Sequence, residues 1–212
     1  MDQLAEAARR ALPSYEGSSA VGSYLSGRFA QRHHDWGTAR KYMGYVLEKE
    51  PENSALLKRA MVLNIGAGDY DRAFEIAQTL HDDEEQRDAL TSMFLTAHAF
   101  HEKDFERAQN IVAEMPESGL SMFIMPLLYS WSVAATGEYD VEGLQSNTIH
   151  LYHAILISEY LDKKDVVKDM LKAALSAGEI SAEDLERIGD VYAHLNDFES
   201  AEALFQQALL FE

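Results

Sequence analysis

The sequence contains no cysteine and few of the residues that break helices. Zero Cys excludes disulfides, thiol catalysis and the usual structural zinc sites, although it fits a reducing or an oxidising compartment equally well. Only 4 Pro and 12 Gly occur among 212 residues, whereas helix-favouring Ala, Leu, Glu, Lys and Gln are abundant. Since 47% of the residues are apolar, the chain can bury a substantial core. We therefore expect an all-α globular protein with little or no β-strand.

Positive charge is also scarce. The 18 Lys and Arg residues are outnumbered by 36 Asp and Glu residues, which gives a formal net charge of −18. Phosphate backbones and anionic lipids repel such a chain, and no cluster of Lys and Arg offsets the repulsion. Nucleic acid is therefore not an expected partner.

Long hydrophobic runs are missing as well. Residues 1–12 have no apolar core of the length that a signal peptide requires, so a cytoplasmic location is expected for the chain as given, unless it is a piece of a longer protein. The nearly charge-free stretch 119–135 is short for a membrane span and contains Pro126 and three Ser. We expect a buried helix there and no membrane insertion.

Common catalytic constellations are absent too. The sequence has no GxGxxG, Walker loop, GxSxG or HExxH motif, so neither an enzyme nor a cofactor is predicted. Two pairs of histidines, His98 with His101 and His150 with His153, are spaced to share a metal on a helix. A site would need a third ligand, which the sequence does not identify, and no metal site is predicted.

An acidic residue followed by an aromatic one recurs along the chain. The pairs are Asp35-Trp36, Asp69-Tyr70, Asp104-Phe105, Glu138-Tyr139 and Asp197-Phe198. The first four aromatics are 34, 35 and 34 positions apart, and the 59 positions before the last leave room for an irregular unit, in which Asp165-Val166 falls. Each pair follows a short polar or Gly-containing bend, and a small residue recurs three positions after the aromatic, at Ala39, Ala73, Ala108 and Ala201. This pattern predicts about six helix hairpins, in which the aromatic packs across the hairpin over the small residue.

The last unit, residues 185–209, resembles the tetratricopeptide repeat family nearly throughout. The signature positions are filled by Leu185, Ile188, Gly189, Tyr192, Asp197, Phe198, Ala201, Phe205 and Ala208. The resemblance implies a right-handed α-solenoid of about six antiparallel helix hairpins over residues 20–212, preceded by a short helix and linker at residues 1–19. The fourth unit, with Glu142 and Gly143, and the fifth, with Asp169 at the small position, depart from the signature and are expected to be distorted.

In this family the first helix of each hairpin lines a concave groove. Carrying over its inward positions assigns partner binding to Tyr24, Arg28, Arg32, Lys58, Val62, Met93, Phe100, Leu127 and Trp131. In the fifth unit the same positions are Leu151, Ala154, Ser158, Leu161 and Asp162. The implied groove is basic at one end, apolar in the middle and acidic at the other end, where Glu183, Glu186 and Asp190 lie. A full carboxylate clamp is absent, because Tyr24 and Arg28 stand where Lys and Asn are required.

The resemblance therefore implies a non-catalytic scaffold that binds a segment of a partner polypeptide, although some of these side chains could instead be core. Two alternatives stay open. The chain could form homo-oligomers through its C-terminal hairpin, because Leu204, Phe205, Leu209, Leu210 and Phe211 have no polar helix after them. It could also be a regulatory domain that binds a small ligand or a metal.

Overall fold

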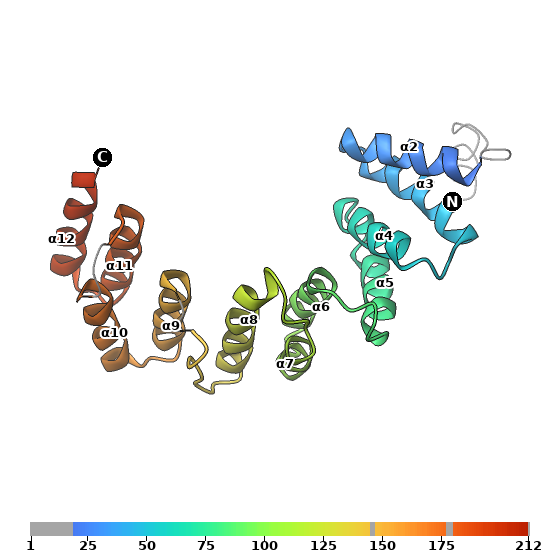
Figure 1. The fold of residues 1–212 in the computed structure, drawn as a ribbon. Coiled ribbons are helices and arrows are strands. Elements are labelled where there is room, and N and C mark those ends of the chain that lie inside the picture. The colour runs from blue at the N-terminus through green and yellow to red at the C-terminus, as the bar shows by residue number, and fades with distance from the viewer. Residues whose placement is uncertain (1–18, 145–146, 177–179, 212) are drawn as a thin grey trace, which may run out of the picture. The chain divides into compact units, whose positions relative to one another are not determined.

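The computed structural model describes residues 19–144, 147–176 and 180–211, and all regular structure in these ranges is helical (Figure 1). The prediction of an all-α protein is confirmed for these residues. The helices are α2 (Ala20–Arg32), α3 (Trp36–Lys49), α4 (Ser54–Gly66), α5 (Tyr70–Asp82), α6 (Ala89–His101), α7 (Phe105–Ala113), α8 (Ser121–Ala135), α9 (Thr148–Tyr160), α10 (Lys164–Ser176), α11 (Ala182–His194), α12 (Phe198–Ala208) and the 3-10 turn η1 (Leu209–Phe211). The helix predicted at residues 1–12 lies outside the described residues.

The chain divides into two compact units. The first unit runs to Phe94 and the second begins at Leu95, so the boundary falls inside α6. In the first unit α2 packs on α3, α3 on α4 and α4 on α5. In the second unit α7 packs on α8, α8 on α9, and α9 on α10, while α11 packs on α9 and α12. A right-handed solenoid that is continuous over residues 20–212 stays a prediction.

Four of the bends between paired helices share one geometry. The residue before the Asp of the acidic–aromatic pair has a positive φ, which is 59° at His34, 76° at Gly68, 59° at Lys103 and 61° at Asn196. The N–H of the following Asp donates to the carbonyl five residues earlier, at 2.9–3.0 Å, and so closes the first helix as a Schellman motif. The side chain of the same Asp accepts from the N–H three residues later and caps the second helix. The recurring Asp is therefore a structural residue.

The small and aromatic positions of the repeat differ in how they pack. The recurring alanines are all buried, in agreement with the predicted close approach of paired helices. Trp36, however, also lies against Gly66 at the end of α4, the next first helix, and Tyr139 Oη is 2.9 Å from Ser158 Oγ of α9. Tyr70 and Phe198 are exposed, so the prediction that every aromatic packs across its own hairpin is wrong for these two.

The fifth hairpin, α9 with α10, has a different register from the predicted one. Its bend has the positive φ, 55°, at Asp162, so Lys163-Lys164 stand where the other hairpins have the acidic–aromatic pair. The prediction placed Asp165-Val166 there, which is two residues too late. Val167, which is buried, occupies the small position that was assigned to Asp169.

The fourth unit begins with α8 and then departs from the hairpin pattern. Gly137 supplies the positive φ of 89°, but Glu138 follows it in place of the Asp that caps other second helices. The described residues 138–144 contain no helix, although Val141 and Leu144 are buried. The expected distortion of this unit is present: an irregular segment fills the core where a second helix was predicted.

Helix α8 contains Pro126 in its interior. Proline lacks an N–H and disturbs the carbonyls of the preceding turn. One of these, the carbonyl oxygen of Phe123, accepts a hydrogen bond of 2.8 Å from Nε2 of the buried His150 in α9. A histidine of the next helix thus supplies a donor beside the proline. Neither α8 nor any other helix in the described ranges has the length and apolarity needed to cross a membrane.

Candidate functional site

The predicted partner-binding residues fall into two sets, one in each unit. Those of the first unit are Tyr24, Arg28, Arg32, Lys58, Val62 and Met93, and those of the second are Phe100, Leu127 and Trp131. They lie on α2, α4, α6 and α8, the first helices of the first four units, although α8 has no second helix after it in the described residues. The two sets are described separately.

A basic cluster surrounds Tyr24 in the first unit. Arg28 Nη1 donates to Tyr24 Oη at 3.3 Å, and the guanidinium of Arg59 lies 5.7 Å from the centre of the Tyr24 ring. The hydrogen bond from Arg28, followed by the charge of Arg59, lowers the pKa of Tyr24. Arg32 is exposed one turn further along α2. These residues present positive charge on a strongly negative chain, and Arg59 was not among those predicted.

The other predicted residues of this unit are less available to a partner. Lys58 Nζ pairs with Asp88 at 2.8 Å. Burial raises the pKa of Asp88, but the hydrogen bonds from Lys58 and the Thr91 N–H outweigh it and leave that pKa below its usual value. Val62 and Met93 are half-buried. Lys58 therefore serves an ion pair within the unit.

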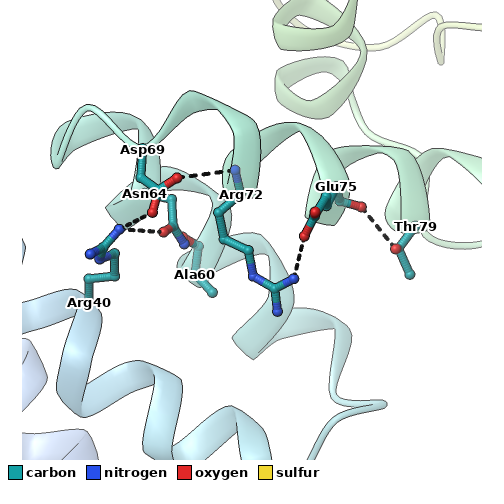
Figure 2. Close-up of polar contacts among 7 residues, drawn as sticks. All are labelled: Arg40, Ala60, Asn64, Asp69, Arg72, Glu75 and Thr79. Carbon is teal, nitrogen blue, oxygen red and sulfur yellow. Dashed lines mark hydrogen bonds and ion pairs between the residues drawn. The ribbon is translucent and has the colours of Figure 1, made fainter. Parts of the chain in front are cut away.

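A polar network links α3, α4 and α5 (Figure 2), and it borders a cleft lined by residues of the same three helices. Asp69 caps α5 through its Oδ1, which accepts from the N–H of Arg72 at 3.2 Å, while its Oδ2 pairs with Arg40. Arg40 also reaches Asn64 Oδ1 at 3.5 Å, and Arg72 Nη1 pairs with Glu75 at 2.5 Å. The cleft encloses about 510 Å³, with apolar walls that include Leu47, Pro51, Leu57 and Ile76. Because both of its arginines already pair with carboxylates, the cleft does not favour an anionic ligand.

Trp131 lies at the centre of an aromatic group in the second unit. Its Nε1–H donates to Nδ1 of His153 at 3.0 Å, so the neutral imidazole carries its proton on Nε2. The rings of Trp131 and Tyr160 meet edge to face with their centres 6.1 Å apart. Trp131 is half-buried, whereas Tyr160 is exposed. The junction of α8 and α9 therefore presents a fixed aromatic surface.

The two histidines near this surface have separate partners. Burial, followed by the charge of His150, lowers the pKa of His153, which keeps its imidazole neutral at pH 7 and able to accept from Trp131. His150 instead donates to the Phe123 carbonyl. Among the residues that the structure describes, no group of three or more His, Asp or Glu side chains is placed to hold a metal ion.

Charged residues lie where α9 packs on α11. Burial and then the charge of Asp190 raise the pKa of Tyr152, while the charge of Arg187 on α11 acts in the opposite direction. Glu159 Oε1 lies 3.4 Å from Nδ1 of His194 and also connects α9 with α11. Glu186 and Asp190 are exposed on α11.

The structure brings Leu127 and Trp131 of the second unit together, and it corrects two assignments in the fifth unit. Leu127 and Trp131 both pack on the core cluster formed by α8, α9 and the segment between them. Phe100 meets Phe105 of its own hairpin, with ring centres 5.7 Å apart. In the fifth unit Ala154 and Ser158 are buried and therefore cannot line a groove, which corrects their assignment.

Sequence reasoning missed Tyr152 and Tyr160, which take the inward positions of α9 once the register is corrected. A signal for them exists in the sequence. Counting one repeat of 34 positions back from Phe198 reaches Lys164, the first residue of α10, and fixes the register of the fifth hairpin.

Comparison with known proteins agrees with the repeat architecture. No protein-family model matches the sequence, and no curated protein matches it. A solved tetratricopeptide repeat protein from Parabacteroides merdae is similar in structure, with a TM-score of 0.55 and 13% identity over 97% of this chain and 83% of that one. MamA from Desulfovibrio magneticus aligns with a TM-score of 0.48 and 14% identity over 92% of this chain and 96% of that one. The chain therefore has the fold of a tetratricopeptide repeat protein.

Proposed function

We propose that the chain is a non-catalytic scaffold that binds a polypeptide segment of another protein, chiefly through one surface of its second unit. We define this surface, the aromatic–acidic face, as Leu127, Trp131 and Tyr160 of α8 and α9 together with the exposed Glu186 and Asp190 of α11, which packs on α9. The observation that carries the proposal is the edge-to-face pair of Trp131 and Tyr160, which come from successive first helices and leave Tyr160 open to solvent.

The chemistry of this face favours a segment that is both apolar and basic. Large aromatic side chains supply most of the binding energy at protein interfaces, and a helix that presents an apolar stripe fits such a surface. Glu186 and Asp190 on the neighbouring helix attract Lys or Arg beside that stripe. The net charge of −18 extends this preference, because it steers basic partners toward the chain and repels acidic ones.

The first unit offers a second contact surface, which is positively charged, whereas the aromatic–acidic face is negatively charged. Arg28, Arg32 and Arg59 gather near Tyr24 on α2 and α4. Acidic residues of a partner favour this second contact, as basic residues favour the aromatic–acidic face.

The test uses intrinsic fluorescence, since the chain has only two tryptophans, Trp36 and Trp131. In the variant Trp36→Phe, emission reports on the proposed face alone. Three designed helical peptides share one Leu and Phe stripe and carry Lys, Glu or Gln on the polar face. We expect the Lys peptide to bind and to shift the emission of Trp131. Its affinity should fall as ionic strength rises, whereas the Glu peptide should not bind.

Two substitutions locate the contact. Tyr160→Ala removes an exposed ring and should weaken binding of the Lys peptide about tenfold, and Asp190→Lys should weaken it further. Tyr70→Ala is the matched control, because Tyr70 is 60% exposed and Tyr160 is 62% exposed. If the peptides bind equally well whatever their charge, or if Tyr160→Ala and Asp190→Lys bind as the parent does, the aromatic–acidic face is not the site.

A further inference from the structure

The first helix of the described chain exposes an apolar stripe. Val21, Leu25 and Phe29 stand four residues apart on α2 and are 68%, 61% and 66% exposed. Phe29 lies five residues before the positive-φ residue of its bend. The residues at the same position in three later first helices are Leu63, Ile157 and Val191, which are 0%, 0% and 1% exposed.

The contrast has a simple cause in the way that hairpins stack. Leu63 belongs to a core cluster with Ala39 and Met43 of the preceding hairpin, and Val191 to one with Val167 and Leu171. A first helix therefore normally buries this side against the hairpin before it. On α2 the equivalent side, which we call the head face (Val21, Leu25 and Phe29), is open.

The last helix exposes the complementary kind of surface. Phe198, Leu209, Leu210 and Phe211 are 66%, 65%, 84% and 60% exposed, and we call them the tail face. Counted from the capping Asp, Phe198 and Leu209 correspond to Trp36 and Leu47 of α3. Trp36 and Leu47 both pack on the cluster that contains residues of α4.

The charges of the two helices also match. α2 carries Arg28 and Arg32 and no acidic residue, although the chain as a whole has a net charge of −18. α12 carries Glu199 and Glu202 and no basic residue. Opposite charges beside apolar faces favour their association and fix its orientation.

We propose that the partner of the head face is the tail face of a second copy of this chain. In this assembly α12 and η1 of one copy cover α2 of the next, in the way that α3 covers α4 within the first unit. The contact is heterologous, because it joins two different faces. An open assembly always keeps one free head face and one free tail face, so it can grow into a longer chain or close into a ring. It uses neither Trp131 nor Tyr160 and is therefore separate from the aromatic–acidic face, although Arg28 and Arg32 of the second proposed contact lie on the same helix, α2.

Because the contact joins two different faces, each face can be blocked separately in a full-length variant. Phe29→Glu blocks the head and Leu209→Glu blocks the tail, and both side chains are exposed, so folding should survive, as circular dichroism can check. Sedimentation velocity over a dilution series should show the parent growing beyond a monomer with concentration, and each variant alone remaining a monomer. An equimolar mixture should form a dimer, because Phe29→Glu retains a tail and Leu209→Glu retains a head.

Tyr70→Glu, at a similarly exposed aromatic outside both faces, is the matched control and should assemble as the parent does. A parent that stays monomeric at every concentration overturns the proposal, as does a mixture of the two blocked variants that forms no dimer. Self-association of Phe29→Glu alone would indicate tail-to-tail contact instead. Assembly that appears only after Leu4→Glu and Leu12→Glu would assign the head face to residues 1–18 of the same chain, and would also overturn it.

Discussion

At the scale of single residues, two glycines allow an aromatic ring to pack directly on the backbone of a helix. A Cβ on Gly66 would lie 2.8 Å from Cδ2 and 2.9 Å from Cε3 of Trp36, and one on Gly189 would lie 2.6 Å from Cε1 of Phe205. Real Cβ atoms do not approach neighbours so closely, so the ring or the helix would have to shift to admit one. The ring opposite therefore explains why a glycine stands at each of these two positions.

We predict that Gly66→Ala lowers the free energy of unfolding of the first unit by about 1–3 kcal/mol, the usual cost of overpacking. Urea unfolding followed by the Trp36 fluorescence of a Trp131→Phe background measures the loss. Gly44→Ala is the control, since Gly44 lies inside α3 and its Cβ would meet nothing within 4 Å. That substitution should stabilise the unit by about 0.5–1 kcal/mol, because alanine favours a helix more than glycine does. Equal effects of the two substitutions would contradict the account.

At the scale of helices, the bend combines the end of one helix with the start of the next in a single Asp. Asp69 makes one contact more than a cap alone, because its Oδ1 caps α5 while its Oδ2 forms an ion pair with Arg40 of α3 (Figure 2). Asn keeps the capping oxygen but loses the charge, and Ala loses both. The pair is partly exposed, with 37% of each side chain accessible, so its ionic part contributes little.

We therefore predict that Asp69→Asn lowers the free energy of unfolding by less than about 1 kcal/mol, and Asp69→Ala by about 1–2 kcal/mol. Asp197→Ala serves as the comparison in the second unit, where Asp197 caps α12 through the N–H of Ser200, and should cost about 1 kcal/mol. Urea midpoints measure all three. If Asp69→Asn costs as much as Asp69→Ala, the ion pair and not the cap dominates at this bend.

The same bends explain which elements could be predicted from the sequence. Where Asp follows a residue that tolerates positive φ, the local chemistry specifies both helix ends, and these hairpins were found. At Lys163 the side chain cannot cap, and the buried pair Val167 and Leu171 holds α10 in place through packing, which a search for acidic–aromatic pairs cannot detect. The resulting slip of two residues hid Tyr160 and therefore half of the aromatic pair in the candidate site.

Tertiary contacts explain the other differences. The hydrogen bond from His150 to the carbonyl of Phe123 depends on α9 packing against α8, so the sequence showed only a pair of histidines with metal-like spacing. The Trp131 bond to His153 has the same origin. Residue spacing identified the helices that carry the candidate site. The hydrogen-bond partners of its polar atoms could not be predicted in the same way, because they depend on how those helices pack against each other.

At the scale of the whole molecule, the question is whether the two compact units unfold together. In stacked repeats each hairpin contacts only its neighbours, so stability is a sum of local and neighbour terms and can differ along the chain. The two tryptophans provide one reporter for each unit, because Trp36 packs on the cluster of α2, α3 and α4, and Trp131 on that of α8 and α9.

We predict that a buried substitution in one unit shifts the transition seen by its own tryptophan more than that seen by the other. Leu63→Ala, at a fully buried position of the first unit, should cost about 2–5 kcal/mol. In urea, the Trp36 signal, read in Trp131→Phe, should move to a lower midpoint while the Trp131 signal, read in Trp36→Phe, moves less. Ile157→Ala in the second unit should reverse the pattern. Equal shifts of both signals in both variants would mean that the boundary inside α6 does not separate the units energetically, and that a ligand on the aromatic–acidic face would stabilise the entire chain.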